Sequence, residues 1–131
     1  GVGLEHFFAE GAARPVVEVV RAKDRIRLPD RMQGDATYYF ESLDFPVPDS
    51  KLNAFFAEFP PEAAPSDPHA HMGAEVIYVI SGRFELTIHG RAERLEAGDS
   101  VYFDPSFEHA YRCAGAEPCK VIVAVTPEVM E

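Results

Sequence analysis

The sequence is poor in basic residues and has no long apolar run. Twelve lysines and arginines stand against 22 aspartates and glutamates, which gives a net charge of −10. This charge indicates that the domain does not itself bind nucleic acid, because phosphate binding requires a clustered positive surface. No apolar run approaches the roughly 20 residues of a membrane span. No basic, apolar leader opens the chain, so we expect a cytoplasmic domain without a membrane partner.

The chain is also poor in cysteine. Its two cysteines, Cys113 and Cys119, flank a short segment that is typical of a hairpin loop between two β runs. Such a loop could bring them within bridging distance, yet two cysteines in a chain without an export signal are more often reduced thiols. Among the nearby residues, only Arg112 and Lys120 are basic enough to lower a thiol pKa. We expect reduced thiols, with a structural disulfide as the alternative.

The chain is rich in apolar residues and in short β runs. With 131 residues, 47% of them hydrophobic, it can bury about two thirds of its unfolded surface in one domain. Runs of β-branched and aromatic residues alternate with Pro, Gly, Asp and Asn. The expected strands span residues 16–21, 25–28, 36–43, 51–59, 74–81, 83–89, 91–96, 100–103, 109–112 and 120–125. About ten short strands predict an all-β antiparallel barrel or double-sheet jelly roll.

Three histidines and a glutamate form the clearest functional pattern. His69, His71 and Glu75 lie close together, and His109 follows further along the chain. Positions 69, 71 and 75 share parity, so in an extended strand their side chains leave the same face. His109 would then come from a neighbouring strand. Three imidazoles and a carboxylate predict one divalent transition metal, such as Zn, Fe, Mn or Ni; the alternative is ordinary surface or core histidines.

Aromatic residues on the expected strands are candidates for a ligand pocket. Tyr111 lies two residues after His109 and so shares a strand face with it. Tyr111 could therefore line a cavity beside the metal. Tyr38, Phe40 and Phe56 could form further walls of that pocket. Plain core packing is the alternative for all four, because aromatic residues on strands commonly serve it.

The histidine segment resembles the first sequence motif of the cupin superfamily. That motif has two histidines one residue apart, a glutamate four residues later and a glycine seven after that. In this chain these positions are His69, His71, Glu75 and Gly82. A glycine is usual six residues before the first histidine, where this chain has Ala63. The departure affects loop geometry and leaves the donor positions intact.

The second cupin motif is matched by Gly98, Pro105 and His109, with three departures. The proline sits one place late, Phe107 stands where a glycine is usual, and Cys113 replaces the usual asparagine. All four donor positions are nevertheless present across the two motifs. The resemblance therefore implies a single cupin double-stranded β-helix, which is a jelly-roll barrel, with metal bound at the motif positions.

The amino-terminal residues 1–10 resemble the end of a phage-repressor-type (Xre-like) helix-turn-helix domain. In a large group of bacterial regulators, that domain precedes a linker, two or three strands and one carboxy-terminal cupin. The similarity continues at residues 38–43, 75–82, 98–104 and 124–127. The chain starts at Gly1, apparently within a helix, so we expect the DNA-binding part to lie upstream of it.

This resemblance divides the chain into two parts and implies a function. Residues 1–15 would be a short helical remnant or linker after the helix-turn-helix domain, and residues 16–131 the cupin domain. The domain would sense a metal, a small-molecule effector or both, and would contact DNA only through the upstream domain. Val16–Val20 is apolar on both faces, so we expect residues 16–28 to supply strands to a homodimer interface; packing within the chain is the alternative.

Two other functions remain open. The same donor set suits a mononuclear cupin enzyme, a dioxygenase, epimerase or isomerase, because such a site keeps open coordination positions. A storage or structural cupin is the third possibility. Spacing alone places no further acid or base at the open face: Glu108 has the opposite parity to His109, and the turn at Pro105 hides the direction of Asp104. We therefore favour the sensor over the enzyme.

Overall fold

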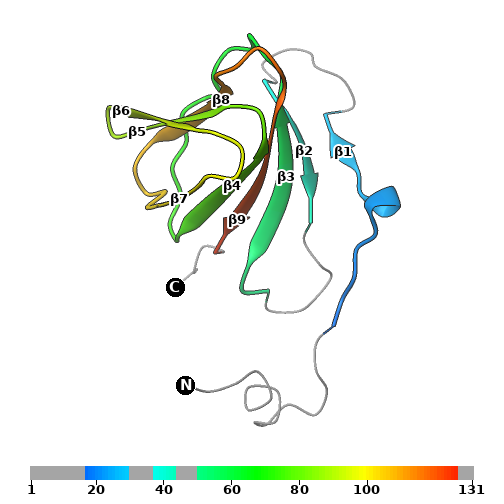
Figure 1. Ribbon diagram of the computed structural model, residues 1–131. Helices are drawn as coiled ribbons and strands as arrows, with labels where there is room; N and C mark the ends of the chain where they lie inside the picture. The colour runs from blue at the N-terminus through cyan, green and yellow to red at the C-terminus, as the bar shows by residue number, and fades with distance from the viewer. Residues whose placement is uncertain (1–16, 30–36, 44–49, 127–131) are drawn as a thin grey trace.

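The computed structural model describes residues 17–29, 37–43 and 50–126. Within these ranges the chain forms one short 3-10 helix and nine β-strands (Figure 1). In chain order the elements are η1 (Ala22–Asp24), β1 (Arg27–Leu28), β2 (Tyr39–Ser42), β3 (Asn53–Phe59), β4 (Glu75–Ser81), β5 (Phe84–Ile88), β6 (Arg91–Leu95), β7 (Ser100–Phe103), β8 (His109–Cys113) and β9 (Cys119–Val125). No helix in this part of the chain is long and apolar enough to cross a membrane.

The strands are arranged in two antiparallel sheets. The larger sheet has the order β1-β2-β3-β9-β4-β7, and the smaller has the order β6-β5-β8. Figure 1 shows the smaller sheet across from the long strands β3, β9 and β4, so that the two sheets form opposite walls of a barrel. The predicted all-β jelly roll is therefore confirmed, and β4 and β8, which begin at Glu75 and His109, belong to opposite walls.

The core lies between the two sheets. Burial along β4 alternates strictly, because successive side chains of a strand point to opposite faces. Ile77 and Val79 of β4 meet Phe84 and Leu86 of β5 and Val121 of β9, and all five side chains are fully buried. Each contributes about 1.5–3 kcal/mol relative to an exposed position. This apolar contact holds the walls at the separation that the site requires.

Nine of the expected strands are present, with ends that differ by a few residues. The first is not: residues 17–21 form no strand, and η1 follows them directly. A strand needs a hydrogen-bonded neighbour, and the larger sheet ends at β1. Val17 and Val19 are accordingly 75% and 61% exposed. The expected helical remnant at 1–15 lies outside the described residues, and the domain boundary at residue 16 stays a prediction.

A buried carboxylate fixes the register of the smaller sheet. Glu85 of β5 is opposite Arg94 of β6 and Arg112 of β8. Its carboxylate accepts hydrogen bonds from Arg112 Nε at 2.6 Å and from Arg94 Nε at 2.9 Å. The hydrogen bond from Arg112 is the main reason that the pKa of Glu85 lies below its usual value. β8 begins at His109, so the register of β8 against β5 also determines the position of that histidine along the sheet.

Both cysteines are buried free thiols, as the sequence predicted. The thiol of Cys113 donates to the carbonyl oxygen of Glu117 at 3.0 Å. Burial raises the pKa of Cys119 to about 12. A thiol with such a pKa carries almost no thiolate at neutral pH, and thiolate is the reactive form. Cys119 is therefore poorly suited to redox sensing.

Candidate metal centre and cavity

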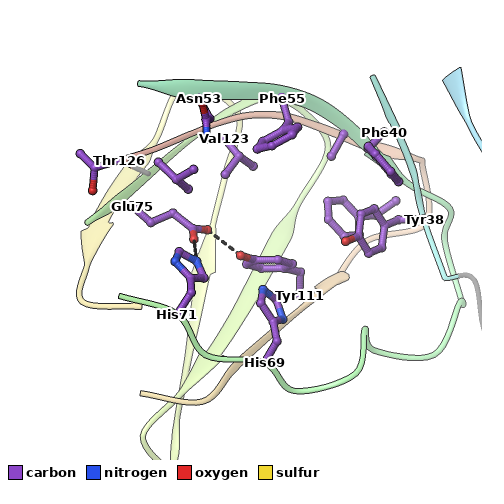
Figure 2. Close-up of a pocket in the computed structure, with 13 residues that line it drawn as sticks. Tyr38, Phe40, Asn53, Phe55, His69, His71, Glu75, Tyr111, Val123 and Thr126 are labelled. Atoms are coloured by element: carbon purple, nitrogen blue, oxygen red, sulfur yellow. Dashed lines mark hydrogen bonds and ion pairs between the residues drawn. The ribbon is translucent and has the colours of Figure 1, made fainter. Parts of the chain in front are cut away.

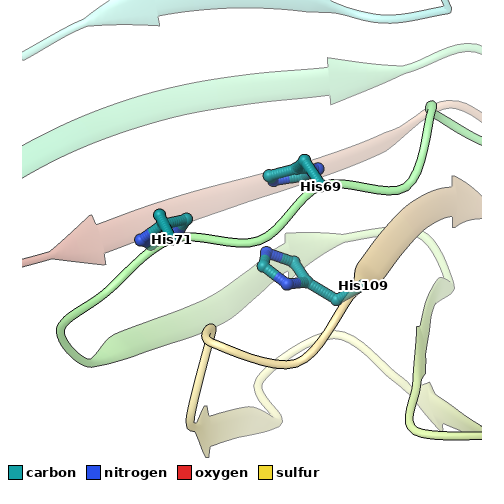
Figure 3. A group of neighbouring side chains, drawn as sticks. All are labelled: His69, His71 and His109. Carbon is teal, nitrogen blue, oxygen red and sulfur yellow. The ribbon is translucent and has the colours of Figure 1, made fainter.

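Backbone pairing brings the first and last of the expected metal donors together. His69 lies in the segment before β4, and His109 is the first residue of β8. Their backbones form an isolated antiparallel bridge, with N–H···O distances of 3.0 and 2.9 Å in the two directions. The backbone N–H of His71 also donates to Pro105 at 2.9 Å. Backbone hydrogen bonds thus connect the histidine segment both to the start of β8 and to the loop before it (Figure 3).

The parity of positions 69, 71 and 75 predicted that one strand supplies three donors, and this prediction is wrong. His69 and His71 precede β4, and a bend at Met72 and Gly73 separates them from Glu75. Gly73 has a φ of +111°, which lies outside the β region and favours glycine. A Cβ at this position would lie 2.5 Å from Oγ1 of Thr126. Both the positive φ and the close approach of Thr126 therefore require glycine at this bend.

The three histidine rings converge on one point. Each of His69, His71 and His109 offers a ring nitrogen, and these three atoms lie within 4.8 Å of one another. The Nδ1 atoms face backbone carbonyl oxygens, at 3.3 Å from Asp67, 3.1 Å from Met72 and 2.9 Å from Phe107, respectively. A carbonyl only accepts, so each Nδ1 is the donor, which leaves Nε2 of His69 and of His109 with a lone pair. Nε2 of His71 lies within hydrogen-bonding distance of the carboxylate of Glu75. Hydrogen bonds of this kind orient histidines that bind metals through Nε2.

The Nε2 atom of His109 is the strongest indication of a missing partner. His109 is 1% exposed, and its Nε2 is buried without a hydrogen bond among the described residues. An unsatisfied buried polar atom costs about 1–3 kcal/mol. Burial lowers the pKa of His109, which favours the neutral imidazole that a metal ligand requires. The donor set and this atom both fit a first-row divalent ion.

Glu75 lies beside the histidines and is divided between two contacts. Its side chain is 1% exposed at the start of β4. Oε1 lies 3.0 Å from Nε2 of His71 and 3.8 Å from Nε2 of His109. Oε2 accepts a hydrogen bond from the hydroxyl of Tyr111 at 2.5 Å (Figure 2). One oxygen of the carboxylate therefore faces the histidine group, and the other faces away from it.

A cavity of about 380 Å³ opens above these groups. Figure 2 shows His69, His71 and Glu75 in the cavity wall, with Asn53, Val123 and Thr126 at the Glu75 end and aromatic rings toward the other end. The aromatic lining comes from the larger sheet, its approach segment and β8: Tyr38, Phe40, Phe55, Phe59 and Tyr111. Tyr38 stacks on Phe59 with a centroid distance of 4.8 Å. This is the usual composition of a small-molecule site, an apolar wall with a few convergent polar groups.

Three of the four expected pocket residues line this cavity, and Phe56 does not. Tyr38, Phe40 and Tyr111 are in the lining. On β3 the adjacent Phe55 is in the lining instead of Phe56, because neighbouring strand residues point to opposite faces. The sequence missed Phe55 and Phe59, which share parity. Both faces of this strand are aromatic, so periodicity alone did not identify the inner one.

Comparison with known protein families places the chain among cupins. Residues 55–125, more than half of the chain, match the cupin domain. The chain is 27% identical over 127 residues to the HTH-type transcriptional regulator PuuR of Escherichia coli. That alignment covers 97% of this chain and 66% of PuuR, so the chain spans just under two thirds of the relative's length.

Solved structures give the same result. The cupin domain of an XRE-family transcriptional regulator from Enterobacter cloacae is 27% identical, with a TM-score of 0.61, and 72% of this chain covers all of that domain. An RmlC-like cupin from Shewanella frigidimarina has a TM-score of 0.66 at 23% identity, over 86% of this chain and 92% of the other. The second similarity concerns the fold alone.

Proposed function

The chain belongs to the cupin family, and we propose that it is the metal- and ligand-sensing domain of a bacterial helix-turn-helix transcription regulator. Its similarity to PuuR runs over 97% of the chain, and a solved domain of an XRE-family regulator has the same fold. In this proposal a separate helix-turn-helix domain, outside this chain, binds DNA in the cytoplasm. The net charge of −10 agrees with this division, because it repels phosphate.

We propose that one divalent ion is held by His69, His71, Glu75 and His109. The observation that carries this step is the buried Nε2 of His109, which has no partner among the described residues and faces the other donors. A first-row ion bound there would supply open coordination positions for a donor atom of an effector. The cavity above, with Tyr38, Phe40, Phe55 and Tyr111 in its wall, would hold the rest of that molecule.

Binding fits this cavity better than proton-transfer catalysis. Apart from the donor residues, the polar lining in the described part of the chain consists of Tyr38, Asn53, Tyr111 and Thr126. Burial raises the pKa of both tyrosines, so neither ionises near neutral pH. Asp104 is exposed and lies in a separate groove. Catalysis by proton transfer would need a group that gains or loses a proton near neutral pH.

The operator response of the longer regulator tests the sensor proposal. We expect a small carboxylate or amine that binds the cavity to change operator affinity by about 5- to 150-fold, the usual range of allosteric coupling. The 131-residue chain alone should not bind duplex DNA at physiological salt. Fluorescence anisotropy with labelled operator measures both, and chromatography determines whether the compound is recovered unchanged.

A cavity-filling variant is the control for this experiment. Ala57 lies in the cavity wall on β3, is 3% exposed and is not one of the four proposed donors. Ala57→Phe should abolish the effector response and leave operator binding without effector intact. Turnover of the compound by the metal-loaded chain, lost in Glu75→Ala, would contradict the sensor and establish the enzyme.

We propose that the regulator is a homodimer that pairs through the β1 edge of the larger sheet. Among the described residues β1 is the last strand of that sheet, and a free sheet edge readily accepts another strand. Apolar side chains gather on and near it: Val17, Val19, Ile26 and Leu28 are 75%, 61%, 70% and 45% exposed. A second copy would cover them. Dimers also suit the parent regulator, because helix-turn-helix pairs bind two half-sites at a fixed spacing.

Light scattering at micromolar concentration should give the mass of two chains. Ile26→Lys should weaken the dimer about 10- to 100-fold, since it removes apolar burial worth roughly 1.5–3 kcal/mol. Tyr102→Lys is the matched control, because Tyr102 is 73% exposed on β7 at the opposite edge of the same sheet. A wild-type mass of one chain would refute the dimer. Dissociation by Tyr102→Lys alone would place the interface at β7.

A further inference from the structure

The contact between Tyr111 and Glu75 connects the two walls of the barrel at the donor site. Tyr111 lies on β8 and Glu75 on β4, 36 residues earlier. The hydroxyl of Tyr111 donates to Oε2 of Glu75 at 2.5 Å, and both side chains are buried. Oε1 of the same carboxylate faces Nε2 of His71 at 3.0 Å. The two oxygens of Glu75 therefore have different surroundings before any ligand arrives.

The tyrosine is itself held in place by backbone and ring contacts. Its backbone N–H donates to Oγ of Ser66 at 2.9 Å, and its carbonyl accepts from the N–H of Ser66 at 2.9 Å. Its ring packs against Phe59, Phe84 and His69, at centroid distances of 6.0, 5.8 and 5.3 Å. Because the ring is enclosed on several sides, the hydroxyl has little freedom to leave the carboxylate.

We propose that Tyr111 is a positioning residue that restricts Glu75 to one-oxygen coordination of the bound metal. This inference rests on the proposed metal site at His69, His71, Glu75 and His109. A carboxylate can bind a divalent ion through one oxygen or through both. With Oε2 held by the tyrosine hydroxyl, only Oε1 is directed at the histidine group. One coordination position that a two-oxygen carboxylate would occupy is then kept free on the cavity side.

Tyr111→Phe removes the hydroxyl and keeps the ring that packs in the core. We expect its affinity for Zn²⁺, measured by competition with a chromophoric chelator, to fall about 10- to 100-fold, as for other hydrogen-bond partners of metal ligands. The visible spectrum of the Co²⁺-loaded variant should weaken, because Glu75 can now bind through both oxygens and raise the coordination number. Glu75→Ala should make the further Tyr111→Phe change silent in both measurements.

Tyr78→Phe is the matched control. Tyr78 lies on β4, as Glu75 does, yet it is 47% exposed on the outer face of that strand and does not line the cavity. It should retain wild-type Zn²⁺ affinity and the wild-type Co²⁺ spectrum. If Tyr111→Phe also retains both while the wild type binds metal, Tyr111 does not position Glu75. If the wild type binds no metal, the metal proposal itself fails, and this inference with it.

A measurement on the wild type decides the matter even if Tyr111→Phe does not fold. The infrared difference spectrum between Zn²⁺-loaded and metal-free protein contains the carboxylate stretches of Glu75, which are identified by their loss in Glu75→Ala. Wide separation of the antisymmetric and symmetric stretches, which is characteristic of one-oxygen binding, would support the proposal. Narrow separation, characteristic of two-oxygen binding, would overturn it.

Discussion

Loss of almost all bound metal is the expected result of replacing His69 and His71 by alanine together. The wild type should retain about one divalent ion per chain, with metal–nitrogen distances near 2.1 Å. The double variant keeps only Glu75 and His109, which come from opposite walls of the barrel. Two donors are too few for the three- or four-ligand sites in which proteins hold such ions. Elemental analysis after dialysis measures the metal content of both proteins.

A histidine outside the donor group provides the control for this variant. His89 lies in the turn after β5, and its ring packs against Phe107 at a centroid distance of 4.7 Å. His89→Ala should retain the full metal content. Thermal unfolding gives a second readout, because Zn²⁺ at 100 times its Kd stabilises a folded protein by about 2.7 kcal/mol. Full metal content in the His69→Ala, His71→Ala protein would refute the assignment.

Most of the fold could be predicted because its strands have a regular pattern. In β5 the apolar residues Phe84, Leu86 and Ile88 alternate with Glu85 and Thr87, and Phe84 and Leu86 are fully buried. The strand expected at residues 16–21 is the exception, because residues 17–21 form no strand. The reason lies outside this segment. Its valines favour a strand, but the larger sheet ends at β1 and no neighbour pairs with them in the described structure. Local preference forms a strand only when a partner is present.

The residues of the candidate site could be predicted from their types and spacing, whereas the geometry in which they meet could not. The motif identified His69, His71, Glu75 and His109, and the structure brings their side chains together. The bend at Gly73 lies close to Thr126, which is 53 residues away in the sequence, and an argument from parity takes no account of such a contact. The cavity wall shows the same limit. Phe55 and Phe56 are adjacent aromatic residues on β3, so the sequence alone did not show which of the two lines the cavity. Both details depend on packing between segments that are distant in the sequence.

Gly82, the glycine of the first cupin motif, stands where two strands and a third segment meet. It occupies the turn between β4 and β5 and has a φ of +81°. A Cβ at this position would lie 2.7 Å from the carbonyl oxygen of Pro118 and 2.8 Å from Cα of Cys119. Both atoms are backbone at the start of β9, so they cannot rotate away as a side chain would. Displacement of β9 would also disturb Val123, which lines the cavity.

Gly82→Ala should therefore lower the free energy of unfolding by about 2–5 kcal/mol, from roughly 1–2 for the left-handed backbone and 1–3 for the forced contact. Gly90→Ala separates the two causes. Gly90 has a similar φ of +75° in the turn between β5 and β6, and a Cβ there meets no atom within 4 Å. It should lose only the backbone part, about 1–2 kcal/mol. Urea unfolding measures both; equal losses would show that the contact with β9 relaxes freely.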